Sequence, residues 1–411
     1  MDEKSKISAQ YCQEQGDALA EQGNCEAAAQ MYGMCMENDE QCLFKLCDLV
    51  FKEQITTDYG SRLYDLIKPL ALNGNAEAQY CLGNMYRIGN GVSKDCEESV
   101  TWYRKSAEQG YANAQHHLGY MYYNGYGVSK DYGEAAKWFR TSAEQGNAKS
   151  QHNLGNMYKD GNGVGQNYKE AAKWFRKSAE QGNAKAQNNL GMIYDNGYGV
   201  IRSYKKAAKW FRKSAEQGNA CAQHNLGYMY KAGHGVGRNY EEAAKWFRKS
   251  AEQGYANAQF DLGLMYENGY GVSQDYEEAV KWYRKSAEQG NADAQNNLGR
   301  MYANVYGGSG ESEKLHRKSA EQNNAVAQFN LGVMYEYGKG VDQNYEEAVK
   351  WYRKSAEQGY PMAQNNLGLM YANGNGVSKD YKEAEKWFRK SAEQGNIKAK
   401  DNLLKLLIKK A

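Results

Sequence analysis

The sequence predicts an all-α solenoid built of antiparallel helix pairs, and three observations support this prediction. A segment of the form Ala-Gln-x-x-Leu-Gly recurs along the chain. Its period is 36 residues, except for one unit of 33 between Gln295 and Gln328. All eight tryptophans stand at one repeat position. The segments begin at Ala78, Ala114, Ser150, Ala186, Ala222, Ala258, Ala294, Ala327 and Ala363, and the tryptophans are Trp102, Trp138, Trp174, Trp210, Trp246, Trp282, Trp351 and Trp387.

The region before the array, residues 1–74, is predicted to hold divergent helical repeats that form an N-terminal cap. Ala18-Leu-Ala-Glu-Gln-Gly-Asn24 resembles the end of a repeat, and Leu70 to Asn75 does so again. An end unit has one face without a neighbour, so departure from the consensus is expected there.

Each unit after residue 75 carries the start and stop signals of two helices. The first helix is expected to begin after an Asn cap such as Asn183 and to end at a Gly-x-Gly-Val loop, whose glycines can adopt positive φ. The second helix begins after an acid-type cap followed three residues later by Glu, the spacing of a capping box. These pairs are Asp131 and Glu134, Asp275 and Glu278, Asn344 and Glu347, and Asp380 and Glu383.

Apolar residues in each unit follow helical spacing, as Ala186, Leu190 and Ile193 do in one first helix. Tyr204, Ala208, Phe211 and Ala215 mark the corresponding face of the second helix, and Trp210 widens it. The glycine inside the first helix, such as Gly191, is expected to reflect a close approach of two helix backbones.

The full unit, Ala-Gln-x-x-Leu-Gly-x-Met-Tyr, then Gly-x-Gly-Val, Asp-Tyr-x-Glu-Ala and Lys-Trp-Phe-Arg-Lys-Ser-Ala-Glu-Gln-Gly, resembles the SEL-one-like repeat (SLR), a relative of tetratricopeptide arrays. The resemblance covers residues 75–396 and implies a right-handed superhelix that acts as an adaptor for other proteins. It also implies that the first helices line the concave groove.

Two parts of the array differ from the consensus. The short unit near 295–327 lacks three residues, and Leu315-His316 replaces its Trp-aromatic pair. Either this is tolerated decay of one repeat or the segment Ala303–Ser312 is a hinge. Residues 397–411 start like a first helix without a second one, and they are predicted to form a C-terminal capping helix.

Composition argues against several classes of protein. The net charge is only +3, so nothing favours nucleic acid as a partner. No run of about 18 apolar residues exists, so no membrane span is expected. The first residues are polar and no apolar segment follows, so no secretory signal is expected and the protein is predicted to be cytoplasmic. Export by a signal-independent route is the alternative.

Seven of the eight cysteines precede residue 100, and no Cys-x-x-Cys pair occurs. Without a secretory signal, the cysteines are expected to be reduced and structural. The seven are Cys12, Cys25, Cys35, Cys42, Cys47, Cys81 and Cys96, and Cys221 stands apart.

The search for chemistry finds no catalytic residues, no metal site and no cofactor motif. His116, His152 and His224 share one repeat position, but equivalent residues of successive units are too far apart to bind one metal ion. Ser203-x-x-Lys206 matches the nucleophile pattern of penicillin-recognising enzymes, yet Ser203 stands where a helix cap is expected.

One face of the first helices varies from unit to unit. It comprises the residues one, five and eight places after the repeat Gln, which share a helix face. We name this set the first-helix stripe. Tyrosines and apolar groups on it favour protein recognition, with Tyr120 and Phe260 as candidate anchors. The candidate partner-binding residues are Tyr80, His116, Tyr120, Tyr123, His152, His224, Tyr228, Phe260, Leu264, Arg300, Phe329 and Val333.

The sequence therefore predicts a non-enzymatic scaffold that binds a protein or peptide in the groove lined by the first helices. Two alternatives remain open: a β-lactam-binding or β-lactam-hydrolysing enzyme, and a host-interaction factor exported without a signal. The sequence leaves the partner, the pathway and the oligomeric state open.

Overall fold

The computed structural model of the chain describes residues 3–52, 58–305 and 310–410, and its regular structure there consists of helices alone. The helices that precede the first repeat are α1 (Glu3–Glu21), α2 (Cys25–Cys35), α3 (Glu40–Phe51) and α4 (Gly60–Leu72). The first helices of the repeats are α5 (Ala76–Ile88), α7 (Ala112–Asn124), α9 (Ala148–Asp160), α11 (Ala184–Asn196), α13 (Ala220–Ala232), α15 (Ala256–Asn268), α17 (Ala292–Val305), α19 (Ala325–Tyr337) and α21 (Pro361–Asn373). The second helices are α6 (Cys96–Glu108), α8 (Tyr132–Glu144), α10 (Tyr168–Glu180), α12 (Tyr204–Glu216), α14 (Tyr240–Glu252), α16 (Tyr276–Glu288), α18 (Gly310–Glu321), α20 (Tyr345–Glu357) and α22 (Tyr381–Glu393), and α23 (Ile397–Lys410) closes the chain.

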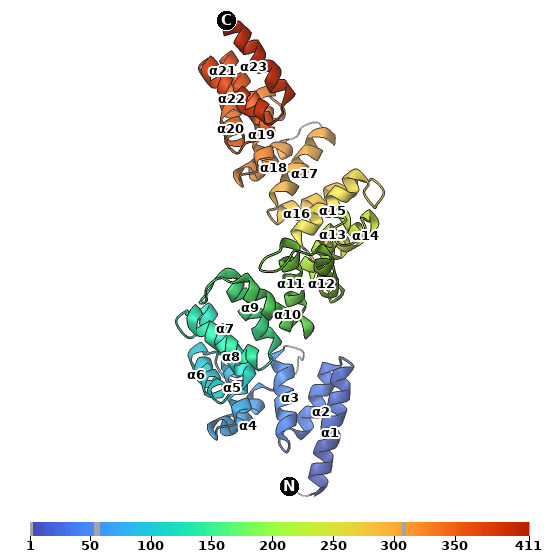
Figure 1. Cartoon of the computed structure of the whole chain (residues 1–411). Helices are drawn as coiled ribbons and strands as arrows, with labels where there is room; N and C mark the ends of the chain where they lie inside the picture. Colours follow the sequence, from blue (N-terminus) through green and yellow to red (C-terminus); the bar gives the residue numbers. More distant parts are fainter. Residues whose placement is uncertain (1–2, 53–57, 306–309, 411) are drawn as a thin grey trace. The chain divides into compact units, whose positions relative to one another are not determined.

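Two compact units make up the chain, Met1–Ser214 and Ala215–Ala411, and we call them the N-terminal and C-terminal units. Within each unit, the two helices of a repeat lie side by side, as α7 with α8 and α15 with α16 do in Figure 1. Within a unit, second helices also pack against the next first helix, as α8 does against α9. This arrangement confirms the predicted solenoid of helix pairs, because within each unit the described repeats pack against their neighbours along the chain.

The first helices begin as predicted where the cap residue is Asn. In α11, the Asn183 side chain accepts a hydrogen bond from the Ala186 N–H at 3.0 Å. Tyr111, Tyr255 and Tyr360 stand at the same position in other units and make no side-chain cap bond. The Asn cap is therefore preferred but not essential. Units with Tyr at this position still form the helix, because packing supplies most of the helix stability.

The second helices have only half of the predicted capping box. Asp131 Oδ1 accepts from the Glu134 N–H at 3.0 Å, as expected. The Glu134 carboxylate, however, pairs with Lys137, and the Asp131 N–H donates to the Tyr122 carbonyl at 3.0 Å. The reciprocal bond was predicted wrongly, since the preceding helix already satisfies the backbone donor that Glu134 would have bound.

Both glycines of the Gly-x-Gly loop are required, for different reasons. Gly125 ends α7 with φ +75°, and its N–H donates to the Met121 carbonyl at 2.8 Å. Gly127 also has positive φ, and a Cβ there would lie 2.1 Å from the Cys96 carbonyl oxygen of the preceding unit. The second glycine is therefore fixed by contact between units as well as by its own backbone conformation.

The constant polar residues of the repeat bind one another. Gln115 Nε2 donates to the Ala107 carbonyl of the preceding unit at 3.1 Å, and Gln145 Nε2 donates to Gln115 Oε1 at 2.7 Å. Ser142 Oγ donates to the Ala112 carbonyl at 2.7 Å. These side chains hold helix to helix and repeat to repeat, so their constancy reflects the scaffold.

The apolar core repeats in the same way. The predicted stripe of α11 is buried at Ala186, Leu190 and Ile193. Six of the tryptophans are buried, but Trp138 and Trp210 are only half-buried. Trp282, for example, lies in one core cluster with Phe247 of the preceding second helix and Leu262 of the first helix in its own unit.

The glycine inside each first helix makes room for a ring and not for a second backbone. A Cβ on Gly191 would lie 2.6 Å from Cδ1 of Phe211 in the same repeat. Equivalent glycines meet the corresponding Phe or Tyr ring, and Gly299 of the short repeat meets the His316 ring. The expectation of close backbone approach was therefore wrong, because an aromatic side chain fills the space between the two helices.

We expect Gly263→Ala to lower the free energy of unfolding more than Gly299→Ala does, by about 1–2 kcal/mol. The new Cβ would lie 2.7 Å from the Tyr283 ring at the first site, and 3.1 Å from the smaller His316 ring at the second. Both changes gain about 1 kcal/mol of helix propensity, so the difference reports the steric overlap. Urea unfolding followed by circular dichroism measures it, and equal losses would contradict this packing.

The short repeat keeps the helix pair with substitute residues. Leu315 takes the place of the Trp, and His316, 3% exposed, takes the place of the aromatic ring. Asn323 adopts φ +67° where other units have glycine. Residues 306–309, within the segment named as a possible hinge, lie outside the described residues, so the hinge stays a prediction.

At the C-terminus, α23 repeats the features of a first helix. Asn396 caps it, Ala399 is buried, and Asn402 donates to Asn365 Oδ1 at 2.9 Å. The boundaries 1–74, 75–396 and 397–411 remain our proposal for the division of the chain.

Candidate functional site

The residues of the first-helix stripe vary from unit to unit, whereas the scaffold residues described above stay nearly constant. The three positions of the stripe have different surroundings in the structure. The first position packs over the aromatic ring of the second helix in its own repeat. Ring centroids lie 5.6 Å apart between His116 and Phe139, and 5.9 Å apart between Phe260 and Tyr283.

The packing at the first position leaves those side chains little surface. His116 is 9% exposed, and Tyr80, His152, His224, Phe260 and Phe329 are half-buried. A substitution at Phe260 or Phe329 would therefore disturb the core as well as any partner contact.

At the fifth position of the stripe, three large side chains face outward, whereas Asn84 at the same position is buried. Tyr120, Met192 and Tyr228 are 42%, 46% and 47% exposed. The remaining candidates at this position, Leu264, Arg300 and Val333, are half-buried. Large apolar groups left open at one repeat position in three of the units are suited to contact with another molecule.

The side chain at the eighth position of the stripe depends on which aromatic residue follows the Trp in the second helix. Arg87 Nε donates to the Tyr103 hydroxyl at 3.2 Å, and the Tyr283 hydroxyl donates to Glu267 at 2.6 Å. Glu336 accepts a hydrogen bond from Tyr352 in the same way. The sequence holds this signal, because Arg or Glu occurs at the eighth position only in units where the residue after Trp is Tyr. Tyr123, the remaining candidate, is half-buried in a unit with Phe.

The sequence reasoning missed the residue two places after the repeat Gln. This side chain reaches back to the stripe of the preceding unit. Asn189 Nδ2 donates to Asn156 Oδ1 at 3.1 Å and lies 3.2 Å from His152 Nε2. Asn330 Nδ2 donates to Asn296 Oδ1 at 3.0 Å. The preference for Asn or Asp at this position is the sequence signal that could have predicted this contact.

In the C-terminal unit, polar and charged groups of the stripe pair with Asp261, which lies two places after the repeat Gln, and with one another. Asp261 lies 2.9 Å from His224 Nε2 and 3.0 Å from Lys231 Nζ. Burial would raise the pKa of Asp261, but the hydrogen bonds from His224 and Lys231 outweigh it and hold that pKa below its usual value. Arg300 and Glu267 form a second pair at 2.5 Å.

In the N-terminal unit, residues of the stripe line two pockets. One pocket of about 160 Å³ is lined by Tyr120, Tyr123, Asn124, Phe139, Asn153 and Asn156. A second, of about 300 Å³, is lined by Lys159, Asp160, Gln166, Tyr168, Asn189, Met192, Ile193 and Tyr198. Together they hold stripe residues from three successive first helices.

The residues considered for chemistry have structural partners. His116 Nδ1 lies 2.9 Å from Ser150 Oγ, and His152 contacts the Asn156 and Asn189 amides. Among the described residues, no three His, Cys, Asp or Glu side chains form a group suited to a metal ion. The Lys206 N–H donates to Ser203 Oγ at 3.4 Å, so Ser203 has the geometry of a helix cap.

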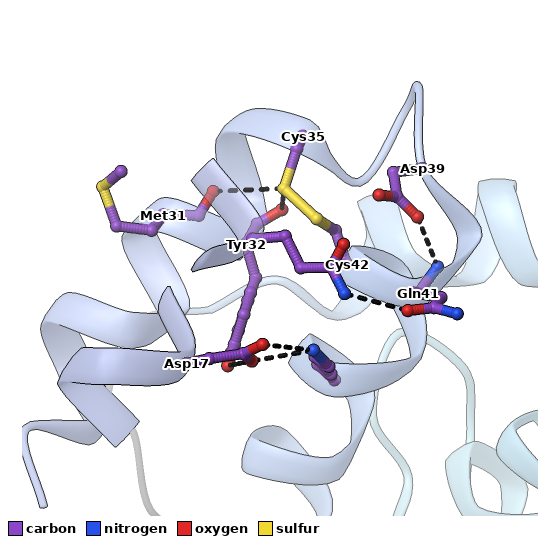
Figure 2. The surroundings of a disulfide bond; sticks show 9 residues. Asp17, Met31, Tyr32, Cys35, Asp39, Gln41 and Cys42 are labelled. Carbon is purple, nitrogen blue, oxygen red and sulfur yellow. Dashed lines mark hydrogen bonds and ion pairs between the residues drawn. A yellow bond between two sulfur atoms is a disulfide. The ribbon is translucent and has the colours of Figure 1, made fainter. Parts of the chain in front are cut away.

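One cysteine pair departs from the expected reduced state. Cys35 and Cys42 form a disulfide that joins the end of α2 to α3, with Cα atoms 5.9 Å apart (Figure 2). Beside it, the Tyr32 hydroxyl and Lys45 Nζ both donate to Asp17 at 2.7 Å. Cys12, Cys47 and Cys81 are buried in the surrounding core without a disulfide.

We expect the Cys35–Cys42 disulfide to stabilise the N-terminal unit by about 2–3 kcal/mol, because it restricts the unfolded chain. A thiol titration of the denatured, unreduced protein should find six thiols, since six of the cysteines carry no disulfide. Dithiothreitol should lower the urea midpoint of wild type and leave that of Cys35→Ser/Cys42→Ser unchanged. Eight titrated thiols would show that the bond is absent.

Comparison with known proteins decides the family. Nine consecutive segments of the chain match the Sel1 repeat: 76–111, 112–147, 148–183, 184–219, 222–255, 256–291, 292–324, 325–360 and 361–396. The chain belongs to the Sel1 repeat family. The Sel1 repeats cover α5 to α22, and the short unit is the segment 292–324.

Solved structures agree with this assignment. The chain is 34% identical to a protective antigen present in uropathogenic Escherichia coli strains, which displays an SLR fold. That match covers 93% of this chain and 90% of the antigen, with a TM-score of 0.61. A Sel1 repeat protein from Oxalobacter formigenes is 31% identical over 85% of this chain and 92% of its own, with a TM-score of 0.46. No curated protein matches the chain significantly.

None of the described helices contains a stretch that could span a lipid bilayer. The Sel1 repeat and its all-helical fold are typical of protein-interaction scaffolds, and protein partners are therefore the class of ligand that the fold suggests.

Proposed function

We propose that this Sel1 repeat protein is a non-enzymatic scaffold and that the first-helix stripe binds a protein or peptide. The observation that carries the proposal is the exposure of Tyr120, Met192 and Tyr228 at one repeat position. The constant Gln, Ser and Gly residues of the repeat are engaged in packing and hydrogen bonds, as described above. The exposed Tyr120 and Met192 contact residues of their own repeat, Tyr126 and Asn188, and leave much of their surface open. Tyrosine supplies large contact area at interfaces.

The cytoplasmic location, the concave placement of the stripe and the absence of catalysis stay part of this proposal. Of the twelve candidate residues, Tyr120 and Tyr228 offer the cleanest test, since their side chains are exposed. Phe260 is the weaker anchor candidate for mutagenesis, because its ring lies on the buried Tyr283 ring.

The test compares proteins recovered from a native-cell lysate by wild type and by Tyr120→Ala/Tyr228→Ala, with quantitative mass spectrometry. The matched control is Lys173→Ala/Lys245→Ala, two exposed second-helix side chains. The proposal expects a partner that binds wild type and the control and is reduced at least about tenfold by the tyrosine variant, a loss of about 1.4 kcal/mol. Equal recovery by both variants would show that the stripe is not the binding surface.

A further inference from the structure

We propose that the two pockets of the N-terminal unit bind an extended, uncharged segment of a partner protein that inserts two apolar side chains about three residues apart. This inference rests on the proposed scaffold function and assigns its partner chemistry. We name the two pockets the Tyr120 pocket and the Met192 pocket, after the exposed residue that each contains.

The Tyr120 pocket has an aromatic floor and uncharged walls. Phe139 of α8 is 1% exposed and forms the floor, while Tyr120 and Tyr123 of α7 face Asn153 and Asn156 of α9. Its volume of about 160 Å³ suits one Leu, Met or Phe side chain. A charged side chain placed here would lose water without meeting an opposite charge, so the lining selects an apolar group.

The Met192 pocket lies one repeat further along the chain, between α9 and α11. Ile193, 3% exposed, and Met192 give it an apolar side. The Tyr168 and Tyr198 rings stack at 5.0 Å and form another wall. Its two charged residues, Lys159 and Asp160, lie 3.4 Å apart and neutralise each other. This pocket therefore also favours an uncharged ligand.

An amide pair lies between the two pockets. Asn156 lines the first and Asn189 lines the second, and their side chains are joined by the 3.1 Å hydrogen bond described above. A ligand that fills both pockets must cross this pair. Amide groups donate and accept hydrogen bonds as peptide groups do, so a ligand with free backbone N–H and C=O groups suits the crossing. An extended segment offers those groups, whereas a helix has used them internally.

The spacing of the pockets fits the same ligand. Side-chain hydrogen bonds join α7 to α9, through His116 and Ser150, and α9 to α11, through Asn156 and Asn189. These first helices are therefore side-chain neighbours, for which a spacing of about 8–10 Å is typical, and an extended chain advances about 3.3 Å per residue. Two side chains three residues apart therefore span the distance from one pocket to the next. Their intervening residues would lie over the amide pair.

The C-terminal unit provides a natural comparison, because its stripe has the same fold and different chemistry. Tyr228 holds the repeat position of Tyr120 and Met192 and is as exposed. On the same helix, however, His224 and Lys231 are joined to Asp261 in one cluster of charged and polar groups. Removing Tyr228 is therefore the matched control for removing Tyr120.

The experiment selects phage-displayed random 12-residue peptides on the full-length protein and measures the winners by fluorescence polarisation. We expect winning peptides with few charges and two apolar residues three apart. We expect their Kd to change less than about twofold between low and high salt, since screening acts on charge pairs. Tyr120→Ala and Met192→Ala should each weaken binding at least about tenfold, and Tyr228→Ala less than about twofold.

Three results would overturn the inference and leave the scaffold proposal standing: charged winners with salt-dependent binding, winners with apolar residues at helical spacing, or loss of binding only in Tyr228→Ala. A selection without enriched peptides also counts against it. If winners bind all three stripe variants as tightly as wild type, the inference fails, and the lysate comparison decides separately whether the stripe binds a protein.

Discussion

Lowering the pH from about 7 to about 5 is expected to destabilise the N-terminal unit strongly. Burial lowers the pKa of His116 to about 3, and those of His117 and His152 to about 4. His316 in the C-terminal unit is lowered to about 4 for the same reason. Three of these four histidines belong to the N-terminal unit, so that unit should respond more.

The sign follows from proton binding. An unfolded histidine has a pKa near 6.5 and takes up a proton below that pH, while the folded histidine stays neutral until about pH 4. The unfolded state therefore binds more protons between these values, and the free energy of unfolding falls as the pH falls. Each histidine contributes at most about 1.4 kcal/mol per pH unit in that window.

A variant taken from the repeat itself tests this account. Asn188 and Asn189 occupy the same repeat positions as His116 and His117, which lie two repeats earlier. His116→Asn/His117→Asn should therefore preserve the packing and remove two of the titrating groups. Urea unfolding at several pH values above about 5, where most carboxylates stay ionised, should show a shallower pH dependence for the variant. An unchanged slope would mean that other groups cause the acid sensitivity.

Trp351→Ala is expected to cost about 3–5 kcal/mol, because it empties a large buried site. The Trp351 ring is 3% exposed and packs with Ala320, Leu331 and Met334. Lys354 Nζ lies 4.3 Å from the ring centroid on its outer side. This tryptophan joins α20 to the preceding short repeat, whose own Trp position holds Leu315.

Hydrogen exchange should localise the loss, with α18 to α20 exchanging faster in Trp351→Ala. Trp351→Leu reproduces the residue that the short repeat uses and should cost less. Trp138→Ala provides a second control, since Trp138 is half-buried and Thr141 replaces the lysine found beside the other rings. If Trp138→Ala proves as costly as Trp351→Ala, burial does not determine the effect.

The repeat period and the residues that begin and end the helices of each unit could be predicted from the sequence. Asn caps and Gly-x-Gly loops act through neighbouring backbone atoms, so their structure follows from local residue types. Asn183 and Gly125 behave as such local signals predict. The family resemblance had the same origin, since each unit repeats the same local signals and apolar spacing.

The sequence-based predictions were wrong where a residue could contact more than one partner. Glu134 binds Lys137 instead of completing its capping box, and Gly191 meets the Phe211 ring. The expected free thiols of Cys35 and Cys42 are joined. Each outcome depends on which atoms the packed helices bring together, and spacing along the chain does not give that information.

The sequence by itself determined that this protein is a solenoid of Sel1 repeats and which positions vary between units. Only the tertiary structure decided which varying side chains remain exposed. Tyr120 and His116 belong to the same stripe, yet one faces outward and the other lies on the Phe139 ring. The physical reason is that helical period fixes a residue's face, whereas its exposure depends on the neighbouring helices that cover that face.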